Sequence, residues 1–484
     1  MFPSDFDDDH TGEMPEWNKK NMDEEVRRAR EAMRRSDASG RDHTPSLEAL
    51  EELVLYCIET EKFDDALSFC TKLVEFMPYS ADAWQKKGYV LNHLERFAEA
   101  LEAYNTALTF DPVDVETHIN RGLTLDALQR FDEAMASIDK ALDLDPNSED
   151  ALFAKATVYE RNERYEEAVK VFLYLLHSER LAKDVWYELG YCYDFLGRYT
   201  ESLEAYNRHI DEDPYNFNAW YNCGVVYSKQ EQYYKAIECY DMALAIKGDF
   251  VAALYNRGNA FAALHRLAEA IESYQEALKN EPSDVASWYN LGNAYQEIGE
   301  FRLAIKSFSR AIALNHDYYE AYFGRGSCYD ALEQYHSALD DYDRTLELKP
   351  DYADVWYAKA DLYYNTNRVE ESLMYYRKAL DFAPSDYECW FDYGDTSLEL
   401  GDLVTAVSAF KRSLALAPHW AEPAYGLAKI YAAQGLIAES ASCLQRAVAL
   451  QAELREDFEQ EFPEFVSPEE FAVLQAALPD SSAS

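Results

Sequence analysis

The chain has 484 residues, with 90 Asp or Glu against 45 Lys or Arg, so its formal net charge is −45 at pH 7. A surface this acidic repels phosphate backbones, which argues against nucleic acid as a ligand for the whole molecule. No stretch approaches 18 continuous apolar residues, so no membrane-spanning helix is expected. The acidity fits the solubility of a long open surface, a salty cytoplasm or basic binding partners, and composition does not separate these explanations.

The eight cysteines show neither a disulfide framework nor a metal site. None lies in a CxxC pair or near paired histidines, and most fall on apolar stripes as small core residues. This usage fits a reducing compartment, so we expect a cytoplasmic protein. The first ten residues, MFPSDFDDDH, lack the basic residues and the apolar run of a secretory signal.

Residues 1–46 differ from the rest of the chain and are expected to form an N-terminal arm. Aspartates near the start indicate a disordered acidic segment: Asp5, Asp7, Asp8 and Asp9. Residues 22–35 carry acids first and arginines last, which complements a helix dipole and predicts a short helix. The arginines form a dense basic cluster: Arg27, Arg28, Arg30, Arg34 and Arg35. This helix is solvated, lies back on the acidic body or serves as a docking peptide, and residues 36–46 are predicted to be a linker.

A 34-residue pattern runs without insertion from Leu47 to Leu454 and divides this part of the chain into twelve units. In residues 285–318, two apolar stripes are separated by Gly299-Glu300, which predicts two short helices joined by a turn. Such a pair cannot bury its apolar faces alone, so it needs another pair stacked on it. The units begin at Leu47, Ala81, Val115, Glu149, Lys183, Phe217, Val251, Val285, Tyr319, Ala353, Tyr387 and Ala421.

Four columns of the pattern stay in phase: Trp at position four, Gly at eight, Ala or Ser at twenty and Pro at thirty-two. This arrangement resembles the tetratricopeptide repeat (TPR), whose pattern is W-x2-L-G-x2-Y, then A-x3-F and a late Pro. The resemblance covers residues 47–454 and implies an all-α fold, a right-handed α-solenoid superhelix of helix-turn-helix repeats. Small residues at positions eight and twenty are expected to let the two helices approach closely. The unit at Glu149 departs most, with Leu152, Ala156 and Arg180 in place of Trp, Gly and Pro.

Residues 455–484 are predicted to cap the solenoid and to end in a tail. The second helix of the last unit is expected to run on through residue 462 and to stop at Pro463. Ser467, Pro468 and Glu470 then have the spacing of an N-cap, a first-turn proline and the acid of a capping box. The helix that they begin is expected to cover the open end of the repeat array, as terminal caps must.

The first helix of each repeat lines the concave groove in the TPR family, so its side chains are the candidate binding surface. Position five is aromatic in nine consecutive units, position two is acidic in nine of twelve, and Asn recurs at positions six and nine. Aromatic side chains at position five can pack on neighbouring repeats, and acids are favoured in the first turn of a helix, so both columns also have structural explanations. The predicted peptide-binding residues are Tyr187, Tyr221, Asn222, Tyr255, Asn256, Asn259, Tyr289, Asn290 and Asn293.

These residues predict a non-enzymatic scaffold or adaptor that holds a peptide segment of a partner protein. Asn can bond a peptide backbone, and carboxylates would favour basic segments. TPR relatives that clamp acidic C-terminal peptides use Lys at positions two or five, and neither position carries Lys or Arg here. No catalytic motif, cofactor loop or metal site is found. The alternatives are a regulator that senses a peptide or small ligand, and the substrate-recognition subunit of a separate enzyme. The oligomeric state is left open.

Overall fold

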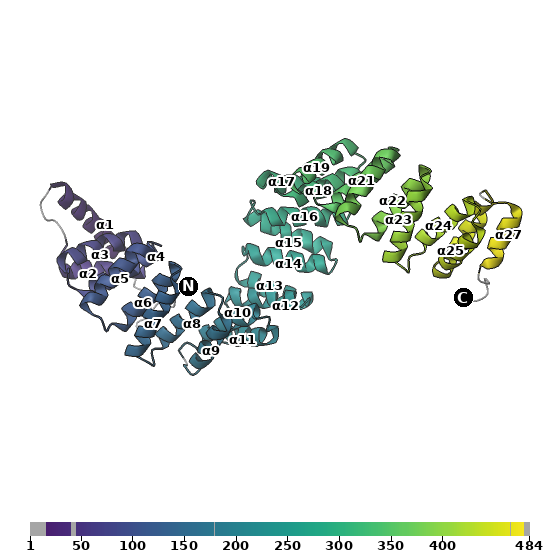
Figure 1. Cartoon of the computed structure of the whole chain (residues 1–484). Helices are drawn as coiled ribbons and strands as arrows, with labels where there is room; N and C mark the ends of the chain where they lie inside the picture. Colours follow the sequence, from purple (N-terminus) through teal and green to yellow (C-terminus); the bar gives the residue numbers. More distant parts are fainter. Residues whose placement is uncertain (1–15, 40–44, 179, 465, 479–484) are drawn as a thin grey trace. The chain divides into compact units, whose positions relative to one another are not determined.

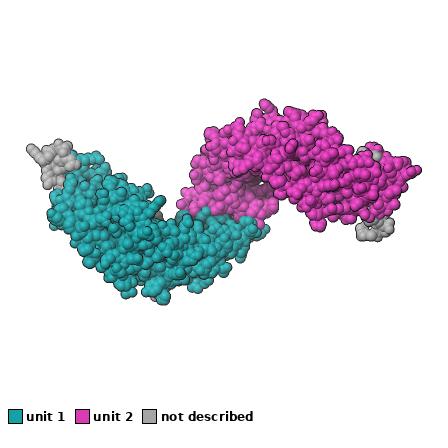
Figure 2. All heavy atoms as spheres, viewed as in Figure 1, with its two compact units in different colours: residues 1–246 teal, residues 247–484 magenta. Residues whose placement is uncertain are grey.

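The computed structural model describes residues 16–39, 45–178, 180–464 and 466–478 (Figure 1). These residues form α-helices and one short 3-10 helix, with no β-strand among them, which confirms the predicted all-helical repeat fold. The chain divides into two compact units, residues 1–246 and 247–484, coloured separately in Figure 2. The acidic segment expected around Asp5–Asp9, residues 40–44 of the predicted linker and the tail from 479 lie outside the described residues.

The helices follow the 34-residue pattern in both units. The first unit contains α1 (Glu16–Ser39), α2 (Leu47–Glu59), α3 (Phe63–Phe76), α4 (Ala81–His93), α5 (Phe97–Phe110), α6 (Val115–Ala127), α7 (Phe131–Leu144), α8 (Glu149–Arg161), α9 (Tyr165–Leu175), α10 (Ala182–Phe195), α11 (Tyr199–Glu212), α12 (Phe217–Lys229) and α13 (Tyr233–Ile246). The second contains α14 (Val251–Ala263), α15 (Leu267–Asn280), α16 (Val285–Glu297), α17 (Phe301–Leu314), α18 (Tyr319–Ala331), α19 (Tyr335–Leu348), α20 (Ala353–Asn365), α21 (Val369–Phe382), α22 (Tyr387–Glu399), α23 (Leu403–Leu416), α24 (Glu422–Ala433), α25 (Ile437–Leu450), α26 (Leu454–Glu461), the 3-10 helix η1 (Phe462–Glu464) and α27 (Pro468–Ala477).

Within a repeat, the first or A helix (even numbers, α2 to α24) packs on the second or B helix (odd numbers, α3 to α25). The turn between them has a left-handed residue at position fifteen in all twelve repeats. Four of these residues are glycines, among them Gly299, and eight are not, among them Glu163. The turn is closed by backbone bonds such as that from Arg96 N–H to Leu91 C=O, which satisfy the helix C-terminus. This hydrogen bonding holds the left-handed backbone even where the residue is not glycine.

In the eight repeats with glycine at position eight, the contact between the A and B helices depends on the missing side chain there. A Cβ atom added to Gly292 would lie 2.6 Å from the ring of Phe308 at position twenty-four, and one added to Gly224 would lie 2.5 Å from Tyr240. The Phe308 ring is fully buried and also lies against Gly324 of the next repeat. The sequence predicted only that small residues let the two helices approach closely. In the structure, the glycine at this position makes room for a particular ring of the B helix.

The Trp and Pro columns are joined by a hydrogen bond between repeats. The indole N–H of Trp288 donates to the carbonyl of Pro282 at 3.0 Å, and Trp84 bonds Pro78 in the same way. The unit at Glu149 has Arg180 in place of this Pro, and the guanidinium bonds the carboxylates of Glu149 and Asp150 instead. The proline thus ends a B helix and also presents its carbonyl to the next A helix.

Helices outside the repeats cover both ends of the array. α1 is longer than the 22–35 segment expected and packs on α2 and α3 through Val26, Ala29 and Met33, which are buried. Arg30 pairs with Asp65 at 2.9 Å, so this helix lies on the acidic body. At the other end, α25 stops at Leu450, which corrects the prediction of one helix through residue 462. Residues 451–453 separate α25 from α26, and α26 then packs with Phe458 buried in the terminal core.

The capping box predicted for the final helix is confirmed. The Ser467 hydroxyl accepts from the Glu470 N–H, and the Glu470 carboxylate accepts from the Ser467 N–H. α27 then packs against α25 and buries Leu474. The predicted cap over the last repeat is therefore formed by α26, η1 and α27 together.

Gly292→Ala should destabilise the second unit by about 1–3 kcal/mol, because the new methyl overlaps the buried Phe308 ring. Chemical denaturation measures this cost. The double variant Gly292→Ala/Phe308→Leu should lose less than the sum of the two single variants, since the smaller side chain leaves space for the methyl. Additive losses would show that the glycine does not act through the ring.

Candidate functional site

The A helices line the inner side of each unit. Neighbouring A helices contact one another, as α6 and α8 do in the first unit and α16 and α18 do in the second. No two neighbouring B helices approach as closely in the described part of the chain. A stack whose A helices lie closer together than its B helices curves toward the A side, so the columns at positions two, five, six and nine belong to the inner surface.

The structure places all nine predicted binding residues on A helices, each half-buried. Tyr187, Tyr221 and Asn222 belong to the first unit, and the other six belong to the second. The position-five rings rest on the position-twenty-four rings of the same repeat. Ring centroids are 5.7 Å apart for Tyr187 and Tyr206, 6.2 Å for Tyr255 and Tyr274 and 5.8 Å for Tyr289 and Phe308. The tyrosine column is therefore held rigidly, with one edge in the core and one edge on the inner surface.

The asparagines at position six link neighbouring repeats. Asn222 donates to the hydroxyl of Tyr187 at 3.1 Å, and Asn290 donates to the hydroxyl of Tyr255 at the same distance. Asn290 also donates to the side-chain oxygen of Asn259 at 2.9 Å, which accepts from the Tyr274 hydroxyl at 2.7 Å. Sequence reasoning expected these amides to face a ligand and did not foresee that they also join one repeat to the next.

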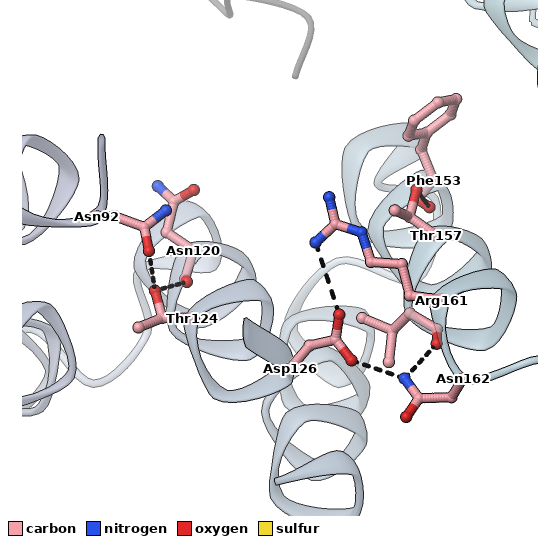
Figure 3. Close-up of polar contacts among 9 residues, drawn as sticks. Asn92, Asn120, Thr124, Asp126, Phe153, Thr157, Arg161 and Asn162 are labelled. Atoms are coloured by element: carbon pink, nitrogen blue, oxygen red, sulfur yellow. Dashed lines mark hydrogen bonds and ion pairs between the residues drawn. The ribbon is translucent and has the colours of Figure 1, made fainter. Parts of the chain in front are cut away.

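Polar contacts between A helices also occur nearer the N-terminus (Figure 3). The Asp126 carboxylate accepts from Asn162 at 2.7 Å and lies 3.6 Å from the Arg161 guanidinium. On the same helix, α6, Thr124 donates to the carbonyl of Asn120 and to the side-chain oxygen of Asn92 on α4, the latter at 3.1 Å. The inner face of α4, α6 and α8 is thus already cross-linked by its own side chains.

Two inner-face carboxyls of the first unit lie close together, Glu160 on α8 and Glu188 on α10. Burial raises the pKa of Glu160, and the neighbouring Glu188 charge raises it further. Burial also raises the pKa of Glu188. Each carboxyl therefore holds its proton more tightly in the folded state than in the unfolded chain. Ionising both groups at neutral pH costs stability, because two negative charges are then held together away from water.

A second acidic region of the inner face was missed by the sequence analysis. Asp392 occupies position six and Asp361 and Asp395 occupy position nine, the columns where other repeats carry Asn. Only the acids at position two were singled out from the sequence. The signal in the sequence is the change from Asn to Asp at positions six and nine, where a carboxylate replaces an amide.

Comparison with known families decides the assignment. One family model described as a tetratricopeptide repeat matches residues 94–149, 119–176, 153–217, 329–387 and 357–421. A second model with the same description matches residues 217–250 and 285–318, and a model described as a TPR repeat matches residues 258–299. The chain belongs to the tetratricopeptide repeat family. No curated protein matches the sequence.

Solved structures similar to this TPR protein include MamA, which is 27% identical over 33% of this chain and 94% of its own, with a TM-score of 0.33. YrrB, described as a TPR protein with an unusual peptide-binding site, is 26% identical over 39% of this chain and 96% of its own, with a TM-score of 0.35. The Cut9–Hcn1 hetero-tetramer of APC/C is 15% identical over 96% of this chain and 95% of that one, with a TM-score of 0.41.

Within the residues that the structure describes, no group of three or more His, Cys, Asp or Glu side chains is arranged to hold a metal ion. Across the same residues, none of the helices combines the length and the apolar character needed to cross a membrane.

Glu160→Gln should raise the melting temperature at pH 8 more than at pH 5. A carboxyl with a raised folded-state pKa costs stability as pH rises above its ordinary value of 4.5, and glutamine does not ionise. A gain of about 1 kcal/mol would raise the melting temperature by roughly 2–4 °C in a unit of this size. The matched control is Glu166→Gln, an exposed acid on α9. An equal gain for both variants at pH 8 would contradict the assignment to the Glu160–Glu188 pair.

Proposed function

We propose that this TPR protein is a non-enzymatic scaffold that binds an extended or helical segment of a partner protein along its inner face. The observation that carries the proposal is the column of half-buried tyrosines and asparagines on the A helices. Their rings are held against the B helices, so little side-chain freedom is lost when a ligand binds. The repeats from Val251 to Tyr318, which carry Asn256 and Asn290 in the second unit, are the proposed centre of the site, and Asn222 occupies the same column in the first unit.

The side chains of this site suit a peptide backbone. Both N–H groups of Asn290 are directed to Tyr255 and Asn259, so its carbonyl oxygen is the atom we assign to the ligand. A carbonyl oxygen accepts from peptide N–H groups without selecting a side chain. Selection would come from the acids of the surrounding surface, which favour basic segments and disfavour nucleic acid.

The proposed setting is the cytoplasm. Seven of the eight cysteines are buried, and none of the eight is paired in a disulfide. Burial raises the pKa of the thiol to about 12 in Cys70 and Cys328, which makes them unreactive packing residues. A protein that uses thiols this way suits a reducing compartment.

A photo-crosslinker tests the location of the site. Benzoylphenylalanine replaces Asn293 on α16 in one variant and Val404 on α23 in another, where Val404 is 84% exposed. The probe is a peptide selected from a random library against the full chain. Crosslinking from position 293 and not from position 404 is expected. Crosslinking from position 404 alone would place the binding surface on the B helices and overturn the proposal.

The triple variant Asn222→Ala/Asn256→Ala/Asn290→Ala should weaken binding of the selected peptide by roughly 0.5–1.5 kcal/mol for each lost hydrogen bond. It should also lower the melting temperature, because Asn222 and Asn290 join neighbouring repeats. The control is Tyr187→Phe/Tyr255→Phe, which removes the two links to tyrosine hydroxyls and keeps the amides, together with the bond from Asn290 to Asn259. The control should melt earlier and lose less peptide affinity than the triple variant, because its rings and amides remain. An equal loss of affinity in both variants would show that the amides act by holding the repeats together.

A further inference from the structure

A pocket of about 440 Å³ opens on the A-helix side of the second unit, between α18, α20 and α22. Its walls include the rings of Phe323 and Tyr357, both half-buried. The acidic residues that line it are Asp330, Asp354, Asp361, Asp386 and Glu388, and no lysine, arginine or histidine lines it. The pocket is therefore both aromatic and strongly acidic, and it lies downstream of the asparagine columns on the same face.

Hydrogen bonds fix one carboxylate that lines this pocket, Asp361, and a neighbouring carboxylate on α22, Asp392. The Tyr376 hydroxyl donates to Asp361 at 2.6 Å, and the Tyr357 hydroxyl donates to Asp392 at 2.5 Å. The equivalent residues three repeats upstream are Tyr274 with Asn259 and Tyr255 with Asn290. The same tyrosine contacts are thus made to neutral amides upstream and to carboxylates here.

These carboxylates are poorly solvated. Burial raises the pKa of Asp361 to about 6, although the bond from Tyr376 opposes the shift. Burial also raises the pKa of Asp392 and of Asp330. The nearby lysines are engaged elsewhere, since Lys359 pairs with Asp343 and Lys429 pairs with Glu461. A cation that enters the pocket would find several carboxylates whose charge the chain itself leaves poorly compensated.

We propose that this pocket receives a lysine or arginine side chain of the bound partner segment. The proposal rests on the function proposed above and names the chemistry of the ligand. The carboxylates of Asp361 and Asp354 would pair with the cationic head, and the rings of Phe323 and Tyr357 would contact its stem or its guanidinium plane. A bare metal ion fits less well, because two walls are aromatic and the described residues hold no metal-binding group.

The test compares two charge-neutralised variants of the full chain. The pocket variant is Asp330→Asn/Asp361→Asn, which neutralises two carboxylates that line the pocket and whose burial raises their pKa. The control is Asp340→Asn/Asp381→Asn, which removes two exposed acids from the B helices α19 and α21. The probe is the library-selected peptide, together with versions in which each arginine is replaced by citrulline or each lysine by acetyl-lysine.

The pocket variant should bind the peptide at least tenfold more weakly at low salt, while the control changes by less than twofold. For one lysine or arginine of the peptide, neutralisation should weaken binding to the wild-type chain by about the same factor. The same neutralisation should not weaken binding to the pocket variant any further. The pocket variant should melt no earlier than wild type at pH 7.5, since it removes poorly solvated charge. Equal losses in the pocket variant and the control would reduce the effect to net charge and overturn the proposal.

The crosslinking result separates the two proposals. Crosslinking from position 293 with unchanged affinity in the pocket variant would overturn the cation pocket and leave the inner-face function in place. Failure to select any peptide that crosslinks from position 293 would overturn both, because the pocket is proposed as part of that same surface.

Discussion

Eight of the twelve repeats depend on one steric constraint, the room that a missing side chain at position eight leaves for a side chain at position twenty-four. Gly292 and Gly324 enclose Phe308, and Gly394 and Gly426 enclose Phe410 in the same manner. Because each such ring touches two successive A helices, it connects a repeat to its neighbour as well as closing the repeat itself. The solenoid thus uses a single contact for both tasks, which explains why the glycine column keeps its 34-residue spacing.

The inner face is built on this packing. The rings at position twenty-four support the rings at position five, whose hydroxyls meet the side chains at position six of the next repeat. In the proposed function, a residue on this surface has two roles, because it links repeats and meets the ligand with its remaining side. Substituting the amides affects both roles at once. Removing the tyrosine hydroxyls removes links between repeats and leaves the amides in place.

Charge varies along a surface whose geometry is repeated. Asn290 and Asp392 occupy the same column and contact the same kind of tyrosine, but the amide donates the hydrogen bond and the carboxylate accepts it. The direction of the bond reverses while the position of the atoms is kept. A repeat protein can in this way change its ligand chemistry locally without altering the stacking of its helices, since the change affects polar atoms on one face only.

The sequence by itself determined the helical repeat, its period and phase, the repeat boundaries and the capping box at Ser467, because these follow from local periodicity and from short-range helix signals. It also identified the A-helix columns, since residues at one repeat position share one environment. Only the tertiary structure decided that Gly292 serves Phe308, that Asn290 bonds Tyr255 and that α1 lies on α2 and α3. These contacts join residues 16 to 35 or more positions apart, or residues outside the repeat. The acidic pocket likewise emerged only when α18, α20 and α22 were placed side by side, because no local pattern shows which carboxylates of an acidic chain share one hollow.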